Sequence, residues 1–148
     1  MESSVLSAGV IVIRWNEDKP HYLLLRAYKY WDFPKGIVDE DESPLEGALR
    51  EVEEETTLSN LSFRWGKDFR ETPPYGRGKV ARYYMAESQE GKVSLPANPE
   101  LGHPEHHEFR WCGYQEAREL VADRVKPILD WAHARIENEP QKKGGAPK

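Results

Sequence analysis

Three glutamates at helical spacing, Glu51, Glu54 and Glu55, are the residues whose type and spacing most directly suggest chemistry. Positions i, i+3 and i+4 of a helix share one face, so the three carboxylates would lie side by side. Like charges at this spacing repel one another by roughly 0.2–0.5 kcal/mol per pair. A hard divalent cation such as Mg²⁺ binds carboxylate oxygens together with substrate phosphates. The spacing therefore indicates either a metal site for phosphate chemistry or a solvated acidic face.

The helix that would carry these glutamates has a clear start signal. Residues 43–46, Ser-Pro-Leu-Glu, form a capping box with proline at the first helical position. We expect the helix to run from Pro44 to about Thr56. Its apolar residues recur at i, i+4 and i+7 and would form a buried stripe: Leu45, Ala48, Leu49 and Val52. The glutamates would then face away from the core.

The same glutamates belong to a longer pattern. Gly36 is followed after five residues by Glu42, and after seven more by the run Arg50–Glu55. This pattern resembles the Nudix box, written GX5EX7REUXEEXGU with U an aliphatic residue. The chain departs from it at Thr57, where the family has glycine, while Leu58 fills the last position. A left-handed glycine commonly ends a helix there, so we expect Thr57 to shift the helix end and to leave the chemistry intact.

The resemblance implies a fold, a reaction and a cofactor. The fold would be of the α/β class, with a mixed β-sheet in an α/β/α sandwich, and the reaction the hydrolysis of a nucleoside diphosphate linked to another group. The cofactor would be Mg²⁺, with Mn²⁺ as the alternative. The implied metal ligands are Glu51, Glu54, Glu55, Glu105 and the main chain at Gly36 or Lys35. Glu54 is also our choice for the group that orients or deprotonates water, with Glu51 as the other candidate. Glu42 and Arg50 would pair and support the loop.

Three segments outside the box suggest the substrate. Residues 31–36 (WDFPKG), 79–87 (KVARYYMAE) and 105–111 (EHHEFRW) resemble motifs of asymmetrical diadenosine tetraphosphate hydrolases, in the same order. Ile37 departs from the histidine that animal and plant members often carry. We therefore expect diadenosine tetraphosphate to be split into ATP and AMP. The alternatives are an RNA 5′-pyrophosphohydrolase, a hydrolase of another nucleotide, and a Nudix domain that binds nucleotides without catalysis.

Several basic and aromatic residues are candidates for binding this substrate. Lys35, Arg26 and Lys79 could contact phosphates, and Lys79 could also neutralise charge during the reaction. Tyr75 and Tyr83 could stack on adenine, with core packing as the alternative for Tyr83. For Trp31 and Phe33, packing beneath the loop is the favoured interpretation. His106 is expected at the rim of the site, since its spacing to other ligands fits no common zinc pattern.

The composition bounds the remaining expectations. The chain has 148 residues, a formal net charge of -5 and one cysteine, Cys112. The charge argues against a general nucleic-acid binder, and we expect a small-molecule partner without a stable nucleic-acid partner. The single cysteine is typical of a reducing cytoplasm, and no leader or membrane span is expected. The oligomeric state is left open.

The order of elements can also be predicted. Strands are expected at 5–15, 22–25, 61–71, 79–87 and 109–112, and helices at 115–122 and 125–137. Residues 28–35 and 98–104 are expected to be loops. We predict one domain over residues 1–139, followed by a disordered tail at 140–148.

Overall fold

A mixed β-sheet forms the middle layer of the computed structural model, which describes residues 5–89 and 92–138. The strand order along its main path is β10-β2-β1-β7-β5, with β3, β4 and β6 paired to β2, β1 and β7. The strands are β1 (Val5–Asn16), β2 (Lys19–Ala27), β3 (Tyr30–Asp32), β4 (Lys35–Ile37), β5 (Leu61–Ser62), β6 (Phe69–Glu71), β7 (Lys79–Ser88) and β10 (Glu108–Cys112). β1 lies at the centre, antiparallel to β2 and parallel to β7.

The central strand β1 is buried on both faces of the sheet. Ile11 and Ile13 belong to one hydrophobic cluster, whereas Val10 and Val12 belong to another. Successive side chains of a strand point to opposite faces, so a strand covered on both sides reads as a continuous apolar run. This explains the uninterrupted Val-Ile-Val-Ile sequence at residues 10–13.

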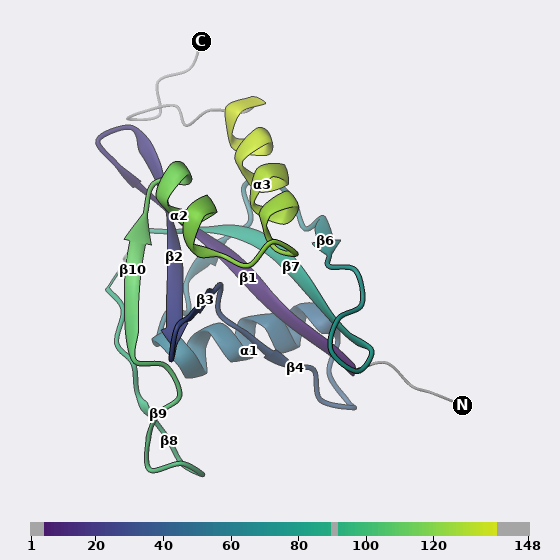
Figure 1. The fold of residues 1–148 in the computed structure, drawn as a ribbon. Coiled ribbons are helices and arrows are strands. Elements are labelled where there is room, and N and C mark those ends of the chain that lie inside the picture. Colours follow the sequence, from purple (N-terminus) through teal and green to yellow (C-terminus); the bar gives the residue numbers. More distant parts are fainter. Residues whose placement is uncertain (1–4, 90–91, 139–148) are drawn as a thin grey trace.

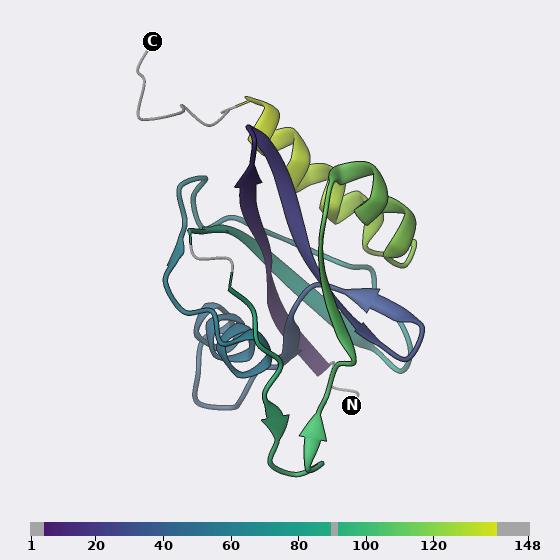
Figure 2. The ribbon, with the colours of Figure 1, turned by 90° about the vertical axis from the view of Figure 1, so that its left-hand side faces the viewer.

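Helices cover both faces of the sheet. α1 (Pro44–Thr56) packs on one face, and α2 (Tyr114–Leu120) and α3 (Lys126–Asn138) cover the other. Figures 1 and 2 show the sheet between these two layers, with α1 opposite α2 and α3. The predicted α/β/α sandwich is confirmed.

Helix α1 begins as its sequence predicts. The Ser43 Oγ accepts a hydrogen bond from the Glu46 N–H at 3.1 Å, and Glu46 Oε1 accepts one from the Ser43 N–H at 2.9 Å. This reciprocal pair satisfies two backbone donors that the helix itself leaves unpaired. Ala48 and Val52 are fully buried against the sheet, so the predicted apolar stripe faces the core.

The end of α1 lies at Thr56, and Thr57 follows in the left-handed conformation with φ 68°. The Thr57 N–H donates to the Glu53 carbonyl at 2.9 Å. The expected shift of the helix end is therefore wrong: threonine takes the same conformation that glycine would take. A side chain with a Cβ strains this conformation, and a β-branched one more so.

Replacing Thr57 by glycine is expected to stabilise the protein. Glycine removes the left-handed strain at the cost of a more flexible unfolded chain, for a net gain of about 1 kcal/mol. Thermal denaturation would then show a rise in Tm of about 2–4 °C. Thr57→Ala is the matched control, because it removes the hydroxyl and the branch but keeps a Cβ. An equal gain from both variants would show that left-handed strain is not the cause.

Three expectations for the strands and loops need correction. The segment 61–71 is interrupted after β5 and resumes as β6, because Trp65 turns into the core beside α3 and is 1% exposed. Gly66, with φ 97°, makes the turn that allows this. Residues 28–35, expected as a loop, contain β3 and the start of β4. Residues 98–104 close a small separate sheet of β8 (Ala97–Asn98) and β9 (His103–Pro104).

Two expectations concern the ends of the chain and membranes. The predicted tail at 140–148 lies outside the described residues. Within residues 5–89 and 92–138, none of the helices combines the length and apolar character needed to span a bilayer.

Candidate metal centre and substrate site

A cavity of about 460 Å³ lies between α1 and the segment that contains β8 and β9. Four of the carboxylates expected at a metal site line it: Glu51, Glu54, Glu55 and Glu105. The rest of the wall is formed by residues 95–100, Pro104 and His106. Three of the carboxylates come from one helix face, and the fourth comes from a segment about 50 residues further along the chain that the sheet brings opposite it.

Glu55 is the most unusual of these carboxylates. It is 8% exposed, and neither of its side-chain oxygens has a hydrogen-bond partner among the described residues. Burial, together with the nearby charges of Glu105 and Glu51, raises the pKa of Glu55 to about 10. A buried carboxylate without partners is costly unless it is protonated or binds a cation. Glu55 therefore has the environment expected of a ligand for an added cation.

Glu51 lies against the backbone of Gly36 in β4. A Cβ built on Gly36 would be 2.1 Å from the Glu51 carboxylate carbon, so no other residue fits there without displacing the carboxylate. Gly9 has a similar role on the neighbouring strand β1, since a Cβ built there would be 2.5 Å from the Cβ of its pairing partner Lys35. These close approaches hold the turn at Gly36 next to the acidic face of α1. Burial also raises the pKa of Glu51.

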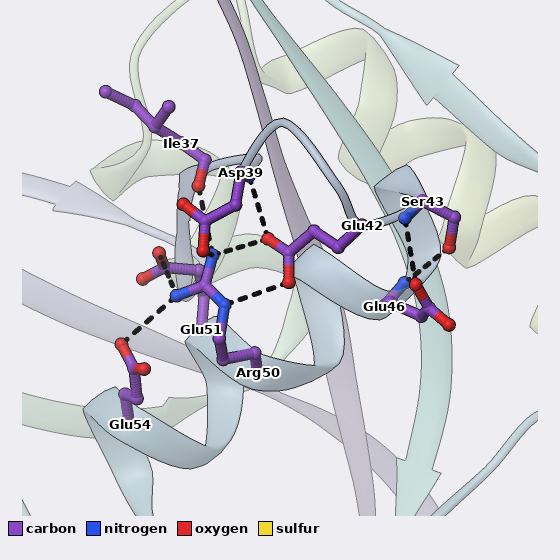
Figure 3. A network of polar contacts seen from close by, with 8 residues as sticks. All are labelled: Ile37, Asp39, Glu42, Ser43, Glu46, Arg50, Glu51 and Glu54. Carbon is purple, nitrogen blue, oxygen red and sulfur yellow. Dashed lines mark hydrogen bonds and ion pairs between the residues drawn. The ribbon is translucent and has the colours of Figure 1, made fainter.

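Arg50 binds the acidic residues that flank the cavity, as Figure 3 shows. Its Nη2 and Nε donate to the two oxygens of Glu42 at 2.7 and 3.1 Å. Its Nη1 donates to Glu51 at 3.0 Å and to Glu54 at 3.3 Å. The expected pairing of Glu42 with Arg50 is present, and Arg50 also bonds directly to two residues of the cavity wall.

The same guanidinium holds the loop before α1. Arg50 Nη2 donates to the Ile37 carbonyl at 3.1 Å, and Glu42 Oε1 accepts from the Asp39 N–H at 2.9 Å. The hydrogen bonds from Arg50 and from the Asp39 main chain lower the pKa of Glu42 to about 2. Glu42 is therefore ionised at any ordinary pH, and the loop is tied to the helix that carries the carboxylates.

The residues present fit a hard divalent cation. They supply carboxylate oxygens, a glycine turn in contact with Glu51, and two buried oxygens on Glu55 that no described residue hydrogen-bonds. Among the described residues, however, no three acidic, histidine or cysteine side chains form a finished ligand cluster. Arg50 bonds to one oxygen of Glu51 and one of Glu54, so a cation bound here would share these two carboxylates with Arg50.

Lys35 lies near His106 but is not among the residues that line this cavity. The Lys35 Nζ is 3.7 Å from Asp32 Oδ2, and His106 forms part of the cavity wall. Burial lowers the pKa of His106; the charge of Asp32 raises it and that of Lys35 lowers it. The charged groups of Asp32 and Lys35 are therefore close to the cavity. Asp32 was not among the residues expected at the site, although its i, i+3 spacing to Lys35 is a readable signal.

Arg26 is bonded to residues that do not line the acidic cavity. It donates to Glu108 at 2.9 Å and to the Tyr28 carbonyl at 2.6 Å, and its guanidinium lies 6.0 Å from the Trp31 ring. Trp31 is half-buried and packs against the core, as favoured from the sequence. A phosphate contact by Arg26 would compete with these partners.

Tyr75 and Lys79 lie together at the start of β7. Their backbones exchange two hydrogen bonds of 2.9 Å, and the Arg124 guanidinium lies 4.0 Å from the centre of the Tyr75 ring. Neither residue is among those that line the described cavity. Arg124 comes from the connection between α2 and α3, and no sequence signal links it to Tyr75.

The stacking role considered for Tyr83 needs correction. Tyr83 is 0% exposed, packs edge to face on Phe33 at 5.6 Å, and donates its hydroxyl to Asp32 Oδ1 at 2.8 Å. No base can reach its ring in this structure. The alternative interpretation, core packing, is the one observed.

The sequence of this chain is similar to those of known proteins. The family model described as NUDIX domain matches residues 5–132. The asymmetrical bis(5′-nucleosyl)-tetraphosphatase of Caenorhabditis elegans is 32% identical over 123 residues, covering 79% of this chain and 85% of that protein. An RNA pyrophosphohydrolase of Shewanella sediminis is 30% identical over 98 residues, covering 57% of this chain and 56% of that protein.

A solved structure shares the fold. The binary complex of the C. elegans Ap4A hydrolase superposes with a TM-score of 0.75 and 24% sequence identity, covering 90% of this chain and 98% of that one. The family match spans most of the chain and includes the box helix, the glycine turn and Glu105. This chain therefore belongs to the Nudix family and is a pyrophosphohydrolase of that family.

Proposed function

We propose that this enzyme is an Mg²⁺-dependent hydrolase of diadenosine polyphosphates that splits diadenosine tetraphosphate into ATP and AMP. The observation that carries the proposal is the cavity lined by Glu51, Glu54, Glu55 and Glu105, in which the two buried oxygens of Glu55 have no hydrogen-bond partner within residues 5–89 and 92–138. The substrate is supported by the C. elegans relative, whose name is an asymmetrical tetraphosphatase, and by the motifs at 31–36, 79–87 and 105–111.

The proposed roles follow from exposure and position. Glu51, Glu55, Glu105 and the main chain at Gly36 would hold Mg²⁺, with Glu54 completing the set. The side chain of Glu54 is 59% exposed, against 14% for Glu51, so Glu54 is best placed to orient and deprotonate an attacking water. Bound Mg²⁺ would neutralise charge on the phosphate chain and make that water more acidic. Arg50 and Glu42 would orient Glu51 and Glu54.

The basic and aromatic residues would bind the two parts of the substrate. We assign phosphate contacts to Lys35, and also to Arg26 and Lys79. Tyr75 would stack on adenine, which would share its ring with the Arg124 guanidinium, 4.0 Å from the ring centre, or displace it. We also place the enzyme in the cytoplasm, on the support of a single buried cysteine.

A second candidate is removal of diphosphate from the 5′ end of RNA. Relatives named RNA pyrophosphohydrolase support it at 30% identity over part of the chain. The net charge of -5 weighs against it, because RNA binding draws on a basic surface. The third candidate, a nucleotide-binding domain without turnover, is disfavoured by the complete set of box carboxylates.

A panel of substrates tests the proposal. We expect kcat/KM for diadenosine tetraphosphate to exceed that for 5′-triphosphorylated RNA and for ADP-ribose by at least about 100-fold, a difference of about 2.7 kcal/mol. Initial rates at saturating Mg²⁺ measure this directly. Faster release of diphosphate from RNA would establish the second candidate. Binding of all three without turnover would establish the third.

A further inference from the structure

The Asp32 carboxylate is held by the core rather than by solvent. Its Oδ1 accepts the Phe33 N–H at 2.7 Å and the Tyr83 hydroxyl at 2.8 Å. Tyr83 is fully buried and packs on Phe33, which is itself 1% exposed. Two donors fixed by packing leave this carboxylate little freedom to rotate. Asp32 is therefore a rigid negative group at the end of β3.

The second oxygen of Asp32 faces Lys35. The distance from Oδ2 to Lys35 Nζ is 3.7 Å, and both side chains are mostly buried, at 24% and 23% exposure. A free lysine side chain carries about 2 kcal/mol of rotamer entropy that must be lost when its ammonium binds a fixed target. An ion pair with a rigid carboxylate removes part of that freedom before the target arrives.

The backbone of Lys35 is also fixed. It pairs with Gly9 of β1. A Cβ on residue 9 would lie 2.5 Å from the Lys35 Cβ, so this close approach requires glycine. Lys35 directly precedes Gly36, against which the Glu51 carboxylate lies. The backbone of Lys35 and its ammonium thus both have defined partners next to the glycine turn that contacts Glu51.

We propose that Asp32 is a positioning residue that directs the Lys35 ammonium toward the phosphate chain of the substrate, with Tyr83 anchoring Asp32. This inference rests on the proposed function, in which Lys35 contacts phosphate. It also gives a role to the buried Tyr83 hydroxyl. Asp32 acts through Lys35 and touches no reacting atom.

A double-mutant cycle tests this role. Asp32→Asn keeps an oxygen that can accept from Phe33 and Tyr83 and removes only the charge, so the fold is retained. We expect Asp32→Asn to raise KM about fivefold with kcat within twofold, because a contact made equally in ground and transition states affects binding alone. Lys35→Met should raise KM about 30-fold. The double variant should match Lys35→Met.

The controls separate positioning from a structural role. Asp68→Asn, which breaks the exposed ion pair of Asp68 with Arg135, should change neither constant. Tyr83→Phe should raise KM in the wild-type background and have no effect when Lys35 is already methionine. An equal loss from Asp32→Asn in both backgrounds, or no loss in either, would overturn the proposal.

The cycle is read in two ways so that it does not depend on the proposed substrate. Kinetics use the member of the panel that the wild type hydrolyses fastest, and calorimetric titration gives Kd for ATP with Mg²⁺. If diadenosine tetraphosphate were hydrolysed slowly and another member of the panel rapidly, the proposed substrate would be wrong. The coupling of Asp32 and Lys35 could still be measured with the other substrate and with ATP. Additive changes in Kd would overturn the inference whatever the substrate.

Discussion

Glu54→Gln is expected to lower kcat for dinucleotide hydrolysis by about 10³-fold, the size of effect usual for loss of a general base. The amide has the shape of the carboxylate but cannot take a proton from water. Glu54 lines the cavity, is the most exposed of the α1 carboxylates there, and is 3.3 Å from a single guanidinium nitrogen of Arg50. Steady-state rates at saturating Mg²⁺ measure the loss, and Tm should be nearly unchanged.

Glu53→Gln is the matched control for this loss. Glu53 is the neighbouring exposed glutamate of the same helix and is not among the residues that line the described cavity. It undergoes the same change of charge and shape, so kcat should stay within about twofold. A loss below tenfold in Glu54→Gln would move the base to Glu51 or Glu105.

Glu55→Gln is expected to weaken Mg²⁺ binding by at least about 100-fold and to stabilise the metal-free protein. The amide removes a ligand oxygen but also removes a buried ionisable group that has no hydrogen-bond partner in the described part of the chain. At pH 8 the free energy of unfolding without metal should rise by about 1–3 kcal/mol. Calorimetric titration with Mg²⁺ and thermal denaturation in chelator measure the two effects.

The pH dependence of this stabilisation has a definite sign. The pKa of Glu55 rises from its ordinary 4.5 to about 10 in the folded protein. Between these values the unfolded chain releases the proton and the folded protein keeps it, so the contribution of Glu55 to stability falls as pH rises. Glu55→Gln should thus match the wild type near pH 4 and exceed it increasingly toward pH 9. Mg²⁺ affinity of the wild type should rise over the same range, because binding releases the proton.

Glu100→Gln controls for charge in the same cavity. Glu100 also lines the cavity but is exposed, so it should change neither the pH profile of stability nor Mg²⁺ affinity by more than about threefold. If Glu55→Gln behaved like Glu100→Gln, Glu55 would not be a metal ligand.

Local signals were sufficient to predict the helix that carries the site. The capping box, the apolar stripe and the glutamate spacing of α1 depend on residues within four positions of one another, and the predicted range from Pro44 to Thr56 is the one observed. The alternative of a solvated acidic face is not supported, since Glu55 is buried and Glu51 lies against Gly36. Glu105 lies outside the box, and its role was predicted from the family resemblance and the motif at 105–111.

Long-range packing decided what local signals could not. Alternation along β7 could not show that the Tyr83 face would be covered by α2 and α3, which buries the ring. The burial of Trp65 against α3 interrupts a strand that looked continuous. Arg124 reaches Tyr75 only because the connection between α2 and α3 folds over the start of β7. Each of these depends on contacts between segments distant in sequence.

Hydrolysis of diadenosine tetraphosphate in ¹⁸O-labelled water with Mg²⁺ tests the central claim most directly. We expect equal amounts of ATP and AMP, a single labelled oxygen in one of the two products, and no reaction in the presence of chelator. Two molecules of ADP would contradict the asymmetric cleavage and place the substrate differently in the cavity. No turnover of the dinucleotide with Mg²⁺ or Mn²⁺ would contradict the proposed substrate itself.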